Sequence, residues 1–141
     1  MMMWEQTETV LGVDYGDVRT GLAVSAGKMA FGAGCVESKN MRKTVNMVAE
    51  AARRRGAVRI VIGDPLNMDG TVGPRSEKCR VFAKMLAEQT GLPVELRDER
   101  LTTVDAHELL SQAGVHGDKR KRAVDELSAT LILQGYLDAL K

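Results

Sequence analysis

The sequence predicts an α/β domain, with a mixed sheet of about five strands flanked by helices. Two observations support this prediction. Up to residue 37, short apolar runs are separated by Gly-containing turns, which is typical of antiparallel strands. From residue 40 onward, apolar runs alternate with stretches of helical period, which requires parallel strands joined by crossover helices. The length of 141 residues suits a single domain covering residues 1–141.

The antiparallel part is expected to form three strands. Residues 9–14 are an apolar run that ends in a turn containing Gly16. Residues 20–25 form a second apolar run, and the short loop between the two predicts a hairpin. Residues 34–37 are expected to add the third strand at the edge of this ribbon.

Helices and strands alternate in the rest of the chain. Residues 40–55 carry apolar side chains at helical spacing and stop before Gly56. Thr102 with Asp105 three positions later fits the capping pattern that opens a helix. In order, we expect a helix at 40–55, a strand at 58–62, a helix at about 75–88, a strand at 92–96, a helix from 102 that is broken at 114–117, and a helix at about 118–140.

Composition excludes several classes of protein. The net charge is +1, so affinity for nucleic acid would have to come from local basic patches. Cys35 and Cys79 are isolated, which argues against a zinc finger or a disulfide framework and is typical of the reducing cytoplasm. No apolar run is long enough for a signal peptide or a membrane span, so no membrane association is expected.

Acidic residues follow the strands of the predicted sheet. Asp14 ends the first strand, and Asp98 and Glu99 directly follow the last one. Ligands and chemistry collect at the carboxyl ends of parallel strands, so we expect Asp14 and one of the other two to share a crevice. Asp125 heads a stripe of small and apolar residues on the last helix, and it is expected to face inward in preference to Glu126.

Each of these acids also has an ordinary structural explanation. Asp14 would bond its own backbone in a turn, the pair after the last strand would balance neighbouring arginines, and Asp125 would favour a helix start. If the carboxylates converge, they raise one another's pKa and need a counter-charge. Oxygen ligands without His or Cys suit Mg²⁺ or Mn²⁺, and two such ions support phosphodiester hydrolysis.

Basic residues gather at three places that could contact phosphates. The densest cluster, comprising Lys119, Arg120, Lys121 and Arg122, is expected in a Gly-bounded connection shortly before Asp125. The other two clusters lie near residues 39–43 and 53–55, and a solvated helix face is the ordinary explanation for each. Arg19, in the turn after the first strand, could reach a phosphate or form a structural ion pair.

Four blocks of the sequence together resemble the YqgF family, the pre-16S rRNA nucleases that are also described as Holliday-junction-resolvase-like proteins. The blocks occur in order and cover the chain from Leu11 to Leu137. They are LGVDYGDVRTGLAVS at 11–25, the spaced residues Gly63, Pro65, Asn67, Gly70 and Gly73, DERLTT at 98–103, and Asp125 followed by Ala129 and Ile132–Leu–Gln134.

The resemblance implies a ribonuclease-H-like fold and a divalent-metal nuclease that matures the 5′ end of pre-16S rRNA. Carried over by position, the catalytic and metal-binding acids are Asp14, Asp125 and Glu99 rather than Asp98. Asn67 belongs to the block that implies substrate binding. The implied cofactor is Mg²⁺ or Mn²⁺, the implied partner is an rRNA precursor or branched DNA, and a monomer or a homodimer is expected.

Two positions depart from the family pattern, and other functions stay open. Asp64 stands where an apolar residue is usual and would add an acid at the mouth of the site, while Ser128 replaces a usual Ala. A Holliday junction resolvase would use the same acids on DNA as a dimer, and a non-catalytic nucleic-acid module would need none of them. The Asp14-x-Gly16 turn also resembles actin-like ATPases, which the chain length excludes.

Overall fold

A five-stranded mixed sheet forms the centre of the molecule, with strand order β3-β2-β1-β4-β5. The computed structural model describes residues 8–102, 106, 114 and 117–140. The strands β1 (Thr9–Asp14), β2 (Arg19–Ala26) and β3 (Met29–Glu37) pair in antiparallel fashion, whereas β4 (Ala57–Asp64) and β5 (Val94–Asp98) continue the sheet parallel to β1. This arrangement confirms the predicted sheet.

β2 and β4 are each slightly longer than predicted, and two other strands differ more from their predicted bounds. β3 begins at Met29, five residues before the predicted start at 34, and Met29 and Phe31 are among its exposed side chains. An edge strand with exposed apolar residues and two glycines lacks the alternation that marks a half-buried strand, so the sequence did not reveal its first half. β5 runs over Val94–Asp98 instead of 92–96 and so reaches the first of the two acids.

The helices begin and end at recognisable caps. In α1 (Met41–Arg55), the Asn40 side chain accepts a hydrogen bond from the Lys43 N–H, and Gly56 ends the helix with a φ of 67°. α2 (Pro74–Thr90) has proline in its first turn. α4 (Gly117–Asp138) closes the fold, and a short 3₁₀ helix, η2 (Glu99–Leu101), follows β5 without having been predicted.

The predicted helix from residue 102 falls largely outside the described residues, including Asp105 of the expected capping pattern. Thr102 itself ends η2, where its N–H donates to the Glu99 carbonyl. Among the described helices, none is both long and apolar enough to cross a membrane.

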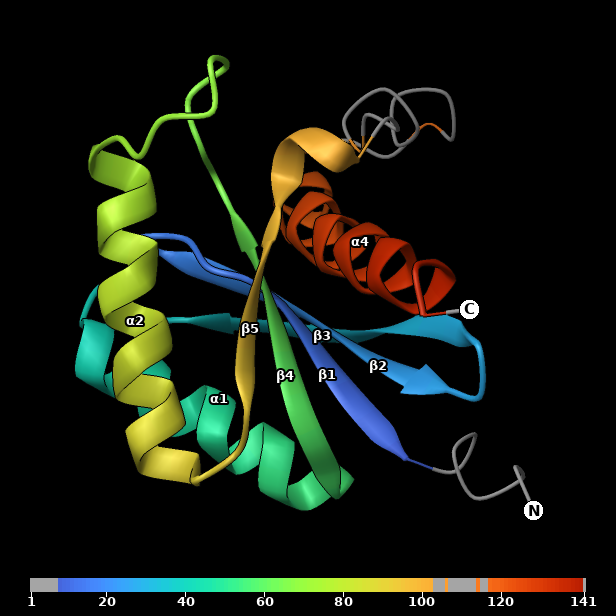
Figure 1. The fold of residues 1–141 in the computed structure, drawn as a ribbon. Helices are drawn as coiled ribbons and strands as arrows, with labels where there is room; N and C mark the ends of the chain where they lie inside the picture. The colour runs from blue at the N-terminus through green and yellow to red at the C-terminus, as the bar shows by residue number, and fades with distance from the viewer. Residues whose placement is uncertain (1–7, 103–105, 107–113, 115–116, 141) are drawn as a thin grey trace.

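The sheet separates two apolar cores, because successive side chains of a strand point to opposite faces. α1 and α2 cover one face and α4 covers the other (Figure 1). On the first face, Leu11 and Val13 of β1 pack with Phe82 of α2. On the second face, Val10 of β1 packs with Leu133 of α4.

α4 approaches the sheet closely because glycine lines the contact. A Cβ atom added at Gly21 of β2 would lie 1.8 Å from the Asp125 carbonyl oxygen, and one at Gly12 would lie 2.7 Å from the Leu133 Cβ. No side chain larger than hydrogen fits at Gly21 without moving the helix. The glycine therefore sets the height of Asp125 above the sheet.

Replacing Gly21 by Ala is expected to lower the free energy of unfolding by about 1–3 kcal/mol or more, because the new methyl group collides with helix backbone. Gly32→Ala is the matched control, since the nearest atoms to its Cβ would belong to the Glu126 side chain and not to helix backbone. Urea denaturation of both variants checks the difference. Equal losses in the two variants would contradict the close packing of α4 at Gly21.

Candidate active site

Three carboxylates from distant parts of the chain line one cavity of about 390 Å³, here called the carboxylate cavity. Asp14 is the last residue of β1, Glu99 follows β5 directly, and Asp125 lies on α4. The other described residues that line it are Arg75, Thr102, Ala106, Val124, Ser128, Leu131 and Ile132. The structure thus brings together the three acids singled out in the sequence.

Asp14 and Glu99 are hydrogen-bonded to each other, and burial raises the pKa of both. Burial raises the pKa of Asp14 to about 8, and the negative charges of Glu99 and Asp125 add to the effect. Burial also raises the pKa of Glu99, although its hydrogen bond with Asp14 lowers it. At neutral pH and without a cation, Asp14 therefore holds a proton and donates it to Glu99.

Asp125 is held by Arg19, the first residue of β2. The Arg19 Nε donates to the Asp125 Oδ2 over 3.1 Å, although 106 residues separate the two in sequence. Glu126, the neighbouring acid, instead lies over β3 and accepts a hydrogen bond from the Gly34 N–H at 2.7 Å. The inward-facing acid of this helix is thus Asp125, and Arg19 forms the ion pair that was one of its two expected roles.

The donor set of the carboxylate cavity fits a hard divalent cation. Its acids offer only oxygen ligands, and the negative charges of Glu99 and Asp125 add to the burial that raises the pKa of Asp14, so a cation would be bound favourably there. Within the described part of the chain, no three acidic, histidine or cysteine side chains already form a cluster that could hold a metal ion. The Asp125 carboxylate is paired with Arg19 and would have to exchange this partner for a cation.

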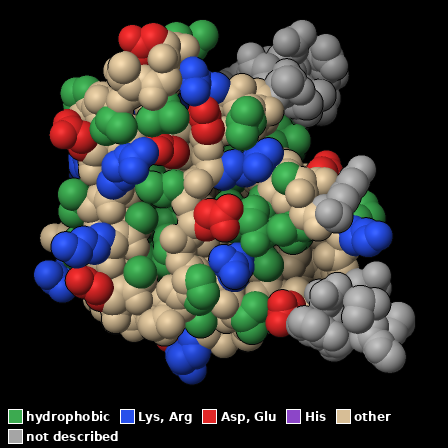
Figure 2. Space-filling view, viewed as in Figure 1, with side chains coloured by type: hydrophobic (Ala, Val, Ile, Leu, Met, Phe, Trp, Pro, Cys, Tyr) green, Lys and Arg blue, Asp and Glu red, His purple; other side chains and the backbone are tan. Residues whose placement is uncertain are grey.

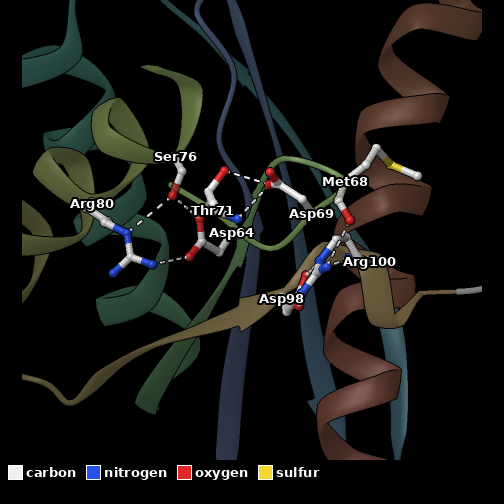
Figure 3. A network of polar contacts seen from close by, with 8 residues as sticks. All are labelled: Asp64, Met68, Asp69, Thr71, Ser76, Arg80, Asp98 and Arg100. Carbon is white, nitrogen blue, oxygen red and sulfur yellow. Dashed lines mark hydrogen bonds and ion pairs between the residues drawn. The ribbon is translucent and has the colours of Figure 1, made fainter. Parts of the chain in front are cut away.

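Asp98 binds Arg100 and, unlike Glu99, is not among the described residues that line the carboxylate cavity. Its carboxylate accepts the Arg100 N–H at 2.9 Å and the Arg100 guanidinium at 2.7 Å, and these contacts hold the pKa of Asp98 below its usual value. Arg100 also donates to the Met68 carbonyl at 3.1 Å (Figure 3). Asp98 and Arg100 together clamp the loop before α2 to the turn that carries Glu99.

Asp64 does not lie at the mouth of the site, so this expectation was wrong. Its buried carboxylate accepts hydrogen bonds from the Ser76 hydroxyl and the Arg80 guanidinium, each at 2.6 Å (Figure 3). Both partners belong to α2, which Asp64 ties to the end of β4. An acid at a position expected to be apolar is accommodated because α2 supplies these two partners.

Asn67 closes its own loop. Its N–H donates to the Thr71 carbonyl and its side-chain amide donates to the Thr71 hydroxyl, both at 2.9 Å. It is not among the described residues that line the carboxylate cavity. In the folded chain, Asn67 shapes the loop before α2, and the structure does not place its side chain beside the three acids.

Residues 119–122 lie in α4, which agrees with the helix expected from about residue 118 and shows that their placement in the Gly-bounded connection was wrong. Lys119, Lys121 and Arg122 line a second cavity of about 370 Å³ with Arg19 and Glu37, here called the basic cavity. Arg19 lines the basic cavity and its partner Asp125 lines the carboxylate cavity, so this ion pair lies between the two cavities.

On the face drawn in Figure 2, Lys and Arg side chains are interspersed with Asp and Glu. This mixing agrees with the net charge of +1. Sequence reasoning missed one cation beside the site, Arg75, whereas the pairing of Arg100 with Asp98 was one of the explanations given for the acids after the last strand. The signal was available for Arg75, which opens a helix directly after a loop from the carboxyl end of a parallel strand.

The strand order, with helices on both faces of the sheet, defines a ribonuclease-H-like fold. RuvC of T. thermophilus, solved with a Holliday junction substrate, matches with a TM-score of 0.60 over 94% of each chain at 15% identity. The fowlpox virus Holliday junction resolvase matches with a TM-score of 0.55 over 94% of this chain and 99% of that one, at 13% identity. At such low identity, these likenesses concern the fold alone.

The chain belongs to the RuvX family, described as Holliday junction resolvase, whose family model matches residues 8–139. A protein of Ruminiclostridium cellulolyticum is 42% identical over 93% of this chain and 94% of its own length. A protein of Syntrophus aciditrophicus is 44% identical over 93% of this chain and 89% of its own length. Both are named "Putative pre-16S rRNA nuclease", which confirms the family resemblance found in the sequence.

Proposed function

We propose that this protein is a divalent-metal-dependent endonuclease that hydrolyses phosphodiester bonds in the 5′-end maturation of pre-16S rRNA in the cytoplasm. The observation that carries the proposal is the meeting of Asp14, Glu99 and Asp125 in one cavity at the carboxyl edge of the sheet. The names of the relatives from Ruminiclostridium and Syntrophus support the choice of substrate.

In this proposal the three acids hold Mg²⁺ or Mn²⁺. Such ions supply Lewis-acid chemistry, activating water and stabilising the leaving oxygen of a phosphodiester. Asp14 must release the proton that it donates to Glu99, and Asp125 must leave Arg19. The Arg19 guanidinium, which already lines the basic cavity, can then contact a phosphate there.

A cleavage assay with Mg²⁺ and with Mn²⁺ tests the proposal on three substrates: an rRNA precursor, a four-way DNA junction and a single strand. Preferential cleavage of the precursor, lost on chelation, is the expected result. The description of the RuvX family favours a second candidate, a Holliday junction resolvase, which requires a dimer. Preferential cleavage of the junction by a dimer would establish that alternative, and no cleavage of any substrate would refute both.

The basic cavity is proposed to contact substrate phosphates. Replacing Lys119, Lys121 and Arg122 by Ala should weaken nucleic-acid binding about equally across sequences and flatten its salt dependence, by about one unit of slope for each lost phosphate contact. Fluorescence anisotropy at several salt concentrations measures both effects. Cleavage at saturating substrate should survive, because these residues lie outside the carboxylate cavity.

The matched control removes the same number of charges from the end of α1, by replacing Arg53, Arg54 and Arg55 with Ala. Arg53 and Arg54 are paired with Glu50 on that helix, far in sequence from the basic cavity. If the salt dependence of binding changes only in this control, the phosphate contacts are made by α1 and not by the basic cavity.

A further inference from the structure

One cation that lines the carboxylate cavity has no hydrogen-bond or ion-pair partner within the part of the chain that the structure describes. Arg75 is the single Lys or Arg among the described residues that line this cavity with Asp14, Glu99 and Asp125. Its positive charge lowers the pKa of Asp14 and of Glu99, which shows that it acts on the site electrostatically. Hydrogen bonds and ion pairs decide whether the guanidinium is fixed in place.

Three other arginines, on β2, α2 and η2, are each paired with an acid. Arg19 is bound to Asp125, Arg80 to Asp64 and Arg100 to Asp98. Lys78, one turn further along α2, is bound to Asp17 at 2.6 Å. Among the described residues, the Arg75 side chain makes no such hydrogen bond or ion pair, so its five N–H donors remain available.

The location of Arg75 is unfavourable for the helix that carries it. Arg75 lies in the first turn of α2, where the partial positive charge of the helix dipole disfavours a cation. It also lines a smaller cavity of about 150 Å³ between this helix turn and the β1–β2 turn, together with Lys78 and Tyr15. An exposed arginine that stabilises neither its helix nor an ion pair suits the binding of an anion.

We propose that Arg75 binds a phosphate of the nucleic-acid strand that enters the carboxylate cavity. The proposal rests on the nuclease function proposed above and adds a phosphate contact on the α2 side. Arg19 and the basic cavity lie on the α4 side, so the strand crosses the three acids between two cationic flanks. The planar guanidinium can hold two phosphate oxygens at once, whereas an ammonium group acts as a point charge.

The test compares Arg75→Ala, Arg75→Lys and the control Lys84→Ala, which removes a charge from an exposed position of the same helix. Binding of a short fluorescent single-stranded RNA is measured in EDTA at several salt concentrations. We expect Arg75→Ala to weaken binding roughly tenfold and to reduce the salt slope by about one. Arg75→Lys should retain the slope with lower affinity, and Lys84→Ala should match the wild type.

Calorimetric titration with Mn²⁺ separates a substrate contact from a structural role. Removing a cation near the acids should leave Mn²⁺ affinity unchanged or tighter, while RNA binding falls. Weaker Mn²⁺ binding in Arg75→Ala, or equal RNA binding in Arg75→Ala and Lys84→Ala, would overturn the proposal. A wild type that binds RNA through Arg75 in EDTA, but cleaves no substrate when Mg²⁺ or Mn²⁺ is present, would refute the nuclease function alone.

Discussion

Asp14→Asn is expected to abolish metal-dependent cleavage while stabilising the metal-free fold. The substitution is nearly isosteric, but an amide cannot supply the negative charge that a divalent cation requires. Loss of a metal-binding carboxylate should cost several kcal/mol of transition-state stabilisation, which corresponds to at least about a thousandfold in rate. Activity within a few-fold of the wild type, on a substrate that the wild type cleaves, would refute the assignment of Asp14.

The stability effect follows from the pKa of Asp14. This pKa is about 8 in the folded protein and close to 4 in the unfolded chain, so only the unfolded chain loses the proton between these values. The wild type should therefore lose stability as pH rises from about 4 to about 8, by at most about 1.4 kcal/mol per pH unit. Asp14→Asn lacks this titration and should be the more stable protein at neutral pH without metal.

Thermal unfolding at several pH values, with and without Mg²⁺, measures these differences. Mg²⁺ should raise the melting temperature of the wild type by mass action and that of Asp14→Asn much less. Asp17→Asn is the matched control, because Asp17 is exposed in the following turn and is paired with Lys78. A control that gains as much stability as Asp14→Asn would show that general charge, and not the buried pair, is responsible.

The second large effect distinguishes the two adjacent acids after β5. Glu99→Gln is expected to abolish cleavage, because Glu99 lines the carboxylate cavity and is hydrogen-bonded to Asp14. Asp98→Asn is expected to reduce cleavage only about tenfold or less, through a looser Arg100 clamp on the loop before α2. Steady-state cleavage rates of the two variants measure the contrast.

Arg100→Ala provides the control for an indirect effect of Asp98. If Asp98 acts only by holding Arg100, both variants should lose activity to a similar extent and keep the Mn²⁺ affinity of the wild type. Glu99→Gln should lose that affinity. Complete loss of cleavage in Asp98→Asn with an active Glu99→Gln would reverse the assignment of the two acids.

Local patterns were sufficient to predict the order of the strands and of α1, α2 and α4, and to single out Asp14 and Asp125, whereas the choice of Glu99 over Asp98 came from the family resemblance. β1 and β4 are apolar runs, which predict buried strands. α1 has a polar cap at Asn40 and a glycine stop at Gly56, which predict where the helix begins and ends. The acids at strand ends were predictable because parallel strands carry their carboxyl ends to one edge of a sheet. The exposed half of β3 was missed because it buries too little to show a period.

The partners of each charged group depended on contacts between distant segments. Whether Arg19 reaches a phosphate or Asp125 depends on α4 crossing β2 at Gly21, and no local pattern records that crossing. The same holds for Asp64, whose burial is stabilised only because α2 brings Ser76 and Arg80 to the end of β4. Local sequence sets the conformation of each segment, but the pairing of buried charges depends on which segments pack together, since an ion pair requires both partners within a few ångströms.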